Sequence, residues 1–179
     1  MMEKYNDFWS YWDDENVQII EMPYKDSTVS AYVILPRKEG YNAYMEEGDR
    51  IWTSKFWQDL DKQIDSRRGS LSLPKFKFEY KKILNSDLMN LGITSIFSDD
   101  ADFSKLTSGG VQVSTVLQKT FVSVNEFGTE AAAVTAVTWS CIGNMDKPPF
   151  KMLVNRPFYF VIREKDSGSF LFMGAITKL

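Results

Sequence analysis

The stretch that decides how this sequence is interpreted is VNEFGTEAAAVTAVT, residues 124–138. After Gly128 it consists almost entirely of small side chains, and its preferences conflict because alanine favours helix whereas valine and threonine favour strand. As a strand, it would have one face without any charge, made of Thr129, Ala131, Ala133, Thr135 and Val137. The only charge after Gly128, Glu130, would fall on the opposite face. The stretch therefore fits either a central strand or a surface loop with a helical turn, and Gly128 supplies the backbone freedom of a hinge.

Extended segments flank this stretch on both sides. Before it, residues 111–125 are predicted to be one long strand, and after it residues 150–163 and 169–176 are predicted as two apolar strands joined by a turn at 166–168. Nearer the N-terminus, three more runs predict strands: residues 17–22, 28–35 and 71–80. Residues 1–15 are aromatic and acidic and fit an edge strand or a loop.

Two segments change to a helical period. Phe56, Leu60 and Ile64 lie four residues apart, which predicts a helix over residues 54–64 closed by Arg67-Arg68-Gly69. A second, shorter helix is expected to begin with Asn85 or Ser86 as its cap, to run through Leu91 and to end at Gly92. The fold class is therefore mixed, with strands dominant.

Composition excludes several kinds of function. The 179 residues have a length typical of one domain, and 21 basic against 24 acidic residues give a net charge of −3, which argues against nucleic-acid binding through bulk basicity. The absence of histidine excludes Ser-His-Asp and Cys-His catalysis, and the single cysteine, Cys141, cannot form an intrachain disulfide. No apolar run reaches the length of a membrane span, so no membrane partner is expected.

Two motifs carry a resemblance to a known family. Residues 124–133, VNEFGTEAAA, resemble the hinge of the serpin family, and residues 154–162, VNRPFYFVI, with Asn155, Arg156, Pro157 and Phe158, resemble the serpin C-terminal signature. Four further segments resemble family landmarks in the family's order: residues 71–76, 91–93, 101–104 and 172–174. The likeness covers nearly the whole chain.

The resemblance implies a fold and an extent. We expect an α+β, mostly antiparallel multi-sheet serpin fold with two or three helices, in which residues 1–179 form the C-terminal portion of a serpin domain and residues 128–150 the reactive loop. Met1-Met2 resembles a point inside the family's chain, somewhat before its middle. The expectation is that these 179 residues lack the N-terminal part and are inactive alone.

The function that the resemblance implies is serine-protease inhibition through a suicide-substrate trap, in which the cleaved loop inserts into a β-sheet. The protein would be an inhibitor and not an enzyme, without catalytic residues, cofactor or metal. The hinge would comprise Glu126, Gly128, Thr129, Glu130, Ala131, Ala132 and Ala133. Small, uncharged side chains on the entering face suit insertion, because bulk or charge would stall it at a tight site. The alternatives are a non-inhibitory carrier or chaperone of the same family, or a β-rich interaction module.

Hinge-to-bond spacing in the family places the scissile bond at Ile142–Gly143, with Met145–Asp146 as the alternative register. Lys147 is the only basic residue in this stretch, but Pro148 follows it and disfavours cleavage by trypsin-like enzymes. The resemblance thus implies an elastase-like or chymotrypsin-like protease as the partner, in an extracellular setting. The basic residues Arg67, Arg68, Lys75, Lys77, Lys81 and Lys82 form a candidate polyanion patch, although alternation on a solvated strand explains the lysines of that strand at least as well.

Overall fold

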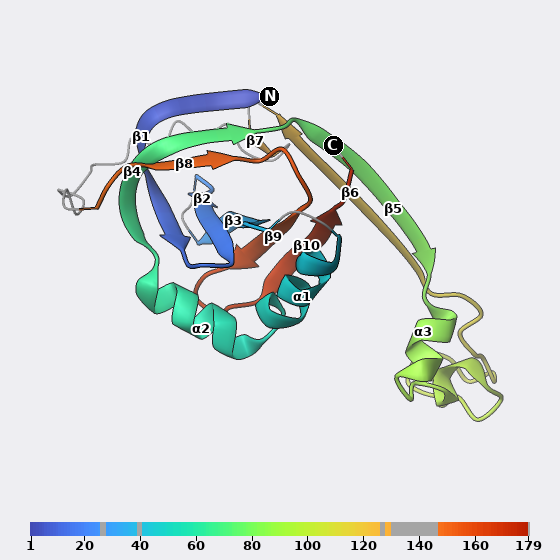
Figure 1. Cartoon of the computed structure of the whole chain (residues 1–179). Helices are drawn as coiled ribbons and strands as arrows, with labels where there is room; N and C mark the ends of the chain where they lie inside the picture. The colour runs from blue at the N-terminus through green and yellow to red at the C-terminus, as the bar shows by residue number, and fades with distance from the viewer. Residues whose placement is uncertain (26–27, 39–40, 126–127, 130–146, 179) are drawn as a thin grey trace. The chain divides into compact units, whose positions relative to one another are not determined.

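The computed structural model describes residues 1–25, 28–38, 41–125, 128–129 and 147–178, without the side chains of residues 41–44 and 128–129 (Figure 1). The chain divides into two compact units, which are described separately below: residues 1–76 with 124–179, and residues 77–123. The fold is α+β with several sheets and few helices, as predicted.

A seven-stranded sheet forms the first unit. In spatial order its strands are β10 (Phe170–Ile176), β9 (Phe158–Glu164), β3 (Val29–Pro36), β2 (Val17–Pro23), β1 (Met2–Asp13), β4 (Asp65–Leu73) and β8 (Phe150–Leu153). Every neighbouring pair is antiparallel except β4 and β8, which run parallel. Figure 1 shows β1 and β4 curving around β2 and β3.

Two helices pack on one face of this sheet. These are α1 (Tyr41–Ile51) and α2 (Ser54–Gln63), and Thr53 caps α2 by accepting a hydrogen bond from the backbone N–H of Phe56. The predicted apolar face of α2 is confirmed: Leu60 is buried, and Phe56 and Ile64 pack against the same core. Side chains from β2, β3 and β9 complete that core: Val17, Ile19, Tyr32, Ile34, Tyr159 and Val161.

The opposite face of the sheet is buried as well. The rings of Phe158 and Phe160 on β9 contact Phe76, with ring centroids 5.5 and 5.3 Å apart, and Phe160 also contacts Phe172. Because both faces are covered, β3 is buried along almost its whole length. Strands that are buried on both faces read as continuous apolar runs rather than as alternating ones, which explains why these strands were recognisable without period-two patterning.

The second unit contains α3 (Asn85–Asn90), a 3₁₀ turn (Ser95–Phe97) and most of two strands, β5 (Phe76–Ile83) and β6 (Leu117–Asn125). The unit begins at Lys77, the second residue of β5. Gly92 follows α3 with φ of 88°, as expected for a glycine that ends a helix. The predicted cap was wrong, because the N-cap position is Leu84. The Asn85 side chain instead donates to the carbonyl of Ser114 and accepts from the N–H of Val116.

Several predicted boundaries were also wrong. Arg67-Arg68-Gly69 does not close a helix but lies inside β4, and the strand predicted over residues 71–80 is divided between β4 and β5. The strand predicted over residues 150–163 is divided into β8 and β9, and β6 begins at Leu117 rather than near residue 111. Helix α1 was not predicted. Among the described residues, no helix has the length and apolar character needed to cross a membrane.

Candidate functional site

The first part of the site is the start of the loop that contains the deciding stretch. The two-residue strand β7 (Gly128–Thr129) pairs antiparallel with the end of β6, with Thr129 opposite Val124 and Gly128 opposite Asn125. Val124 and Val122 on β6 are 6% and 4% exposed, so one face of this strand is buried. Directly paired residues in antiparallel strands share a face. The register partner of Thr129 on β6 is therefore the buried residue Val124.

The other residues predicted for the hinge and the bond lie outside the described residues. These are Glu126, Glu130, Ala131, Ala132, Ala133, Ile142, Gly143, Met145 and Asp146. Their roles stay predictions. The structure resumes at Lys147, so the second part of the site is the place where the chain returns to the sheet.

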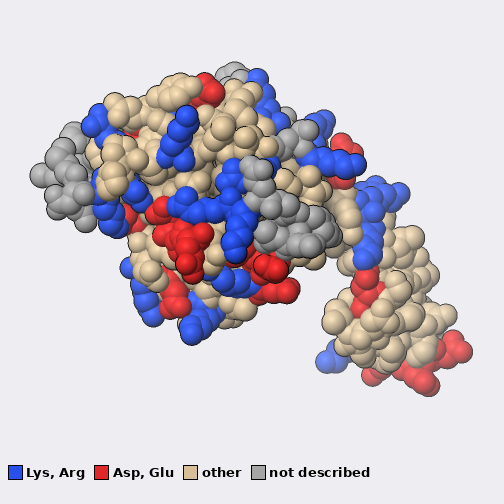
Figure 2. All heavy atoms as spheres, in the orientation of Figure 1, with Lys and Arg blue, Asp and Glu red and all other residues tan. Residues whose placement is uncertain are grey.

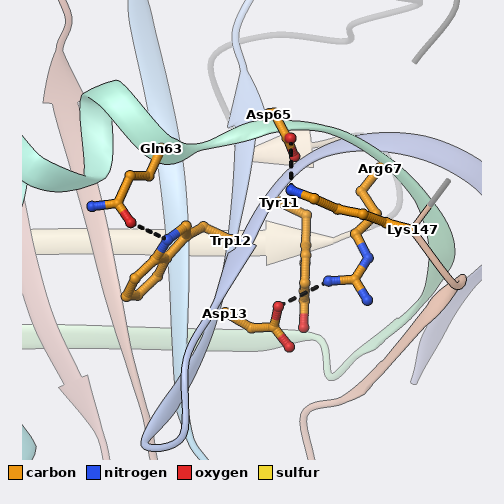
Figure 3. Close-up of a pocket in the computed structure, with 7 residues that line it drawn as sticks. All are labelled: Tyr11, Trp12, Asp13, Gln63, Asp65, Arg67 and Lys147. Atoms are coloured by element: carbon orange, nitrogen blue, oxygen red, sulfur yellow. Dashed lines mark hydrogen bonds and ion pairs between the residues drawn. The ribbon is translucent and has the colours of Figure 1, made fainter. Parts of the chain in front are cut away.

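Two residues of β4 hold this return point (Figure 3). Lys147 Nζ forms an ion pair with Asp65 Oδ2 at 2.9 Å, and Arg67 Nε donates to the carbonyl oxygen of Pro148 at 3.0 Å. Arg67 is itself fixed by an ion pair with Asp13 at 2.8 Å and by its position over the ring of Tyr11. A surface pocket of about 260 Å³, lined in addition by Trp12 and Gln63, opens beside these contacts.

The side chain of Phe150 anchors the first residue of β8. It is 6% exposed, and its ring stacks on that of Tyr11 with centroids 3.8 Å apart and planes inclined by 9°. Gln18 Nε2 donates to both the Tyr11 hydroxyl and the carbonyl of Lys151, linking β2 to β1 and β8. Burial raises the pKa of Tyr11 to about 12, so this hydroxyl stays neutral near pH 7.

Gly69 makes room for the Phe150 ring. A Cβ atom at position 69 would lie 2.2 Å from Phe150 Cδ1, and Gly69 and Phe150 are register partners in the β4–β8 pair. Glycine at this position is therefore required by close packing rather than by an unusual backbone angle.

We expect Gly69→Ala to lower the free energy of unfolding by about 1–3 kcal/mol, because the added methyl group would overlap the ring of Phe150. Urea unfolding followed by circular dichroism measures the change. Gly110→Ala is the matched control, since a Cβ there would meet nothing within 4 Å. Equal stability of the two variants would show that the space around the Phe150 ring can accommodate a methyl group. Phe150→Leu in the Gly69→Ala background should recover part of the lost stability.

The segment Asn155–Phe158 forms the corner between β8 and β9. Arg156 Nε donates to the carbonyl of Pro36 at the end of β3 at 2.8 Å, and its guanidinium also donates to Asn155 Oδ1. Phe158 is fully buried. These side chains fasten the strand that follows the loop to the centre of the sheet, which is a structural role for the signature residues.

Several residues of the candidate polyanion patch have local partners within their own unit of the structure. Arg67 pairs with Asp13, Lys82 pairs with Asp87, and Lys77 lies over the ring of Phe121. Figure 2 shows acidic and basic side chains interspersed on the visible face of the first unit. Sequence reasoning interpreted Arg67 as part of a helix end or of this patch, and so missed its contact with the base of the loop. The alternation of Arg67, Gly69, Leu71 and Leu73 was the available signal for a strand.

Comparison with known proteins identifies relatives over the whole chain. The family model described as Serpin (serine protease inhibitor) matches residues 1–179. Human Serpin B4 is 36% identical over 97% of this chain and 45% of its own length. Iripin-5 of Ixodes ricinus is 38% identical over 91% of this chain and 41% of its own length.

Solved structures agree with this assignment. The thermophilic serpin tengpin in its native state is 36% identical with a TM-score of 0.70, covering 99% of this chain and 46% of that one. A complex of thyroxine-binding globulin with thyroxine is 28% identical with a TM-score of 0.78, covering 97% of this chain and 44% of that one. The chain thus spans less than half the length of the relatives that it matches.

Proposed function

The chain belongs to the serpin family, and from this membership we propose that it supplies the reactive loop and the receiving strand of a serpin-type serine-protease inhibitor. The observation that carries the proposal is the antiparallel pairing of β7 with β6, which starts the loop along the strand beside which it would insert. The loop is residues 128–150, and its hinge is Glu126 with residues 128–133.

The proposed reaction begins as ordinary proteolysis. The serine hydroxyl of the protease attacks the carbonyl carbon of Ile142, an ester forms between that carbonyl and the protease, and the amine of Gly143 leaves with the C-terminal segment. Deacylation by water would complete the cut and release the protease. Inhibition requires that the loop moves before this second step.

Loop insertion continues the register that β7 has started. Continued along β6 during insertion, the same antiparallel register would pair Ala131 with Val122 and Ala133 with Thr120. The uncharged side chains would then enter the face of β6 on which Val122 and Val124 are buried. Glu130 would pair with Ser123 on the other face. Insertion supplies partners for backbone N–H and C=O groups along the entering strand, which is the source of the driving force.

The small hinge residues favour inhibition over the alternative of a non-inhibitory carrier. One structural relative is a complex of thyroxine-binding globulin with thyroxine, so a carrier function occurs within the fold. Bulk, charge or proline on the entering face would block insertion without harming a carrier. This chain has only threonine and alanine at positions 129, 131 and 133. The extracellular setting expected from the resemblance belongs to the proposal as well.

Incubation with elastase-like, chymotrypsin-like and trypsin-like proteases tests the proposal and the scissile bond together. The 179-residue chain is compared with a chimera that carries the preceding part of Serpin B4, because the chain covers 45% of that relative. We expect the chimera to give a denaturant-resistant covalent band with an elastase-like or chymotrypsin-like enzyme, and the released C-terminal peptide to begin at Gly143. The 179-residue chain alone is expected to be cut without trapping.

Three other outcomes of this incubation would contradict the inhibitory function, the scissile bond or the protease specificity. A chimera that is cut or ignored without a covalent band favours a carrier or an interaction module. A peptide that begins at Asp146 moves the bond to the alternative register. A peptide that begins at Pro148, together with trapping of trypsin-like enzymes only, overturns the proposed specificity.

A further inference from the structure

We propose that Arg67, together with Asp65, is a positioning residue that holds the base of the reactive loop and thereby confines cleavage to the Ile142–Gly143 bond. The inference rests on the proposed function, because it concerns the same loop. It favours Ile142–Gly143 over Met145–Asp146, the two scissile bonds that family spacing leaves open.

The structure holds three of the last four residues of the loop, residues 147–150, each by a different group. Lys147 is held through its side chain, Pro148 through its carbonyl oxygen, and Phe150 through its ring. Arg67 joins two of these anchors, because its guanidinium binds the Pro148 carbonyl and lies 5.2 Å from the centroid of the Tyr11 ring on which Phe150 stacks. We name these contacts the base clamp: Asp13, Tyr11, Asp65 and Arg67 with Lys147, Pro148 and Phe150.

Arg67 is the strongest member of the base clamp. Its side chain is 16% exposed, whereas those of Asp65 and Lys147 are 40% and 48% exposed. A charge-assisted hydrogen bond from a mostly buried guanidinium contributes more than a solvated ion pair. The neighbouring Arg68 is exposed and has no side-chain partner among the described residues.

The number of residues between each candidate scissile bond and the base clamp determines which bond a protease can reach. Cleavage after Ile142 leaves four residues, Gly143–Asp146, between the bond and the clamped Lys147, and these span at most about 14 Å when extended. Cleavage after Met145 leaves only Asp146, a span of about 3.5 Å. A protease must accommodate the residues after the bond in its cleft. With one residue available, the enzyme would have to detach Lys147 and Pro148 from β4.

Loss of the base clamp should make the Met145–Asp146 bond accessible to the protease. Lys147, Pro148 and Pro149 would then join the segment that the protease can draw out, while β8 stays in place through fully buried Met152 and Val154. The length available after Met145 would grow from one residue to four. The two bonds would then compete on side-chain preference alone, and an apolar specificity pocket accepts both isoleucine and methionine.

The test measures the ratio of C-terminal peptides that begin at Gly143 and at Asp146 after brief digestion of the 179-residue chain by an elastase-like protease. We expect Gly143 to dominate in the unsubstituted chain. Arg67→Met, which keeps the apolar stem but removes the donors, is expected to shift the ratio toward Asp146 by about tenfold. Arg68→Met is the matched control and should leave the ratio unchanged.

A charge swap separates positioning from stability. Asp65→Lys is expected to shift the ratio by up to about fivefold, because both partners of the ion pair are partly exposed. Combining it with Lys147→Asp restores the pair in reverse and should restore the ratio. Urea midpoints of all variants are measured alongside, because a role in folding alone would shift the ratio only in variants whose stability has also changed.

Two results overturn the inference. One is an unsubstituted chain that is not cut, or whose dominant new N-terminus is a residue other than Gly143. The other is a folded Arg67→Met variant, or an unrescued charge swap, whose ratio equals that of Arg68→Met. The readout counts released peptides, so it does not depend on trapping. Absence of a covalent complex in the chimera would count against the proposed function alone.

Discussion

Thr129→Arg is expected to convert the chimera from an inhibitor into a substrate. The register of β7 on β6 places residue 129 opposite Val124, which is itself buried. An unpaired guanidinium entering that face would raise the barrier to insertion by about 3 kcal/mol, which slows the step about 100-fold. Deacylation by water would then be faster than loop insertion. Gel analysis should show continued cleavage and loss of the covalent band.

Glu130→Arg is the matched control for this substitution. It introduces the same side chain one residue later, where the continued register would pair it with Ser123 on the face that Glu130 would occupy. We expect this variant to keep trapping protease. Ala131→Glu should behave like Thr129→Arg, since position 131 would pair with Val122. If Thr129→Arg still traps one protease per chain, the assignment of residues 128–133 as the leading insert is wrong.

The sequence predicted the parts of the fold that depend on local pattern. Helix α2 was recognisable because Phe56, Leu60 and Ile64 repeat every four residues, and the turn at Gly168 because its residues favour turns. The two family motifs predicted that the chain belongs to a serpin-like fold, which the comparisons confirm. Residue spacing alone is enough for such features, because their partners lie close along the chain.

The base clamp could not be predicted in this way, because its partners are distant in sequence. Arg67 binds Asp13, 54 residues away, and Pro148, 81 residues away. Nothing near Arg67 distinguishes it from Arg68, and only the pleat of β4 places one on Pro148 and leaves the other exposed. The breaks at Pro74 and at Asn155–Pro157 were missed because apolar residues resume directly after each of them, at Phe76 and at Phe158.

The largest loss of stability is expected from Phe158→Ala. Phe158 is fully buried at the start of β9, pairs in register with Ile176 of β10 and contacts the ring of Phe76. Removing a buried phenylalanine ring leaves a cavity and typically costs about 3–5 kcal/mol. Domains are stable by only about 5–15 kcal/mol, so the variant is expected to lose a large share of its native stability.

Tryptophan fluorescence during urea unfolding measures this loss in the unit that contains Phe158. The four tryptophans that the structure describes, at positions 9, 12, 52 and 57, belong to the first unit, so their signal reports that unit. Leu171→Ala is the control, because Leu171 is 60% exposed on the adjacent edge strand and its truncation should change stability by no more than about 0.5 kcal/mol. If Phe158→Ala and Leu171→Ala unfold at the same urea concentration, the signature corner does not hold the sheet together. The strand that follows the reactive loop would then depend on other anchors, such as the hydrogen bond from Arg156 Nε to the carbonyl of Pro36 on β3.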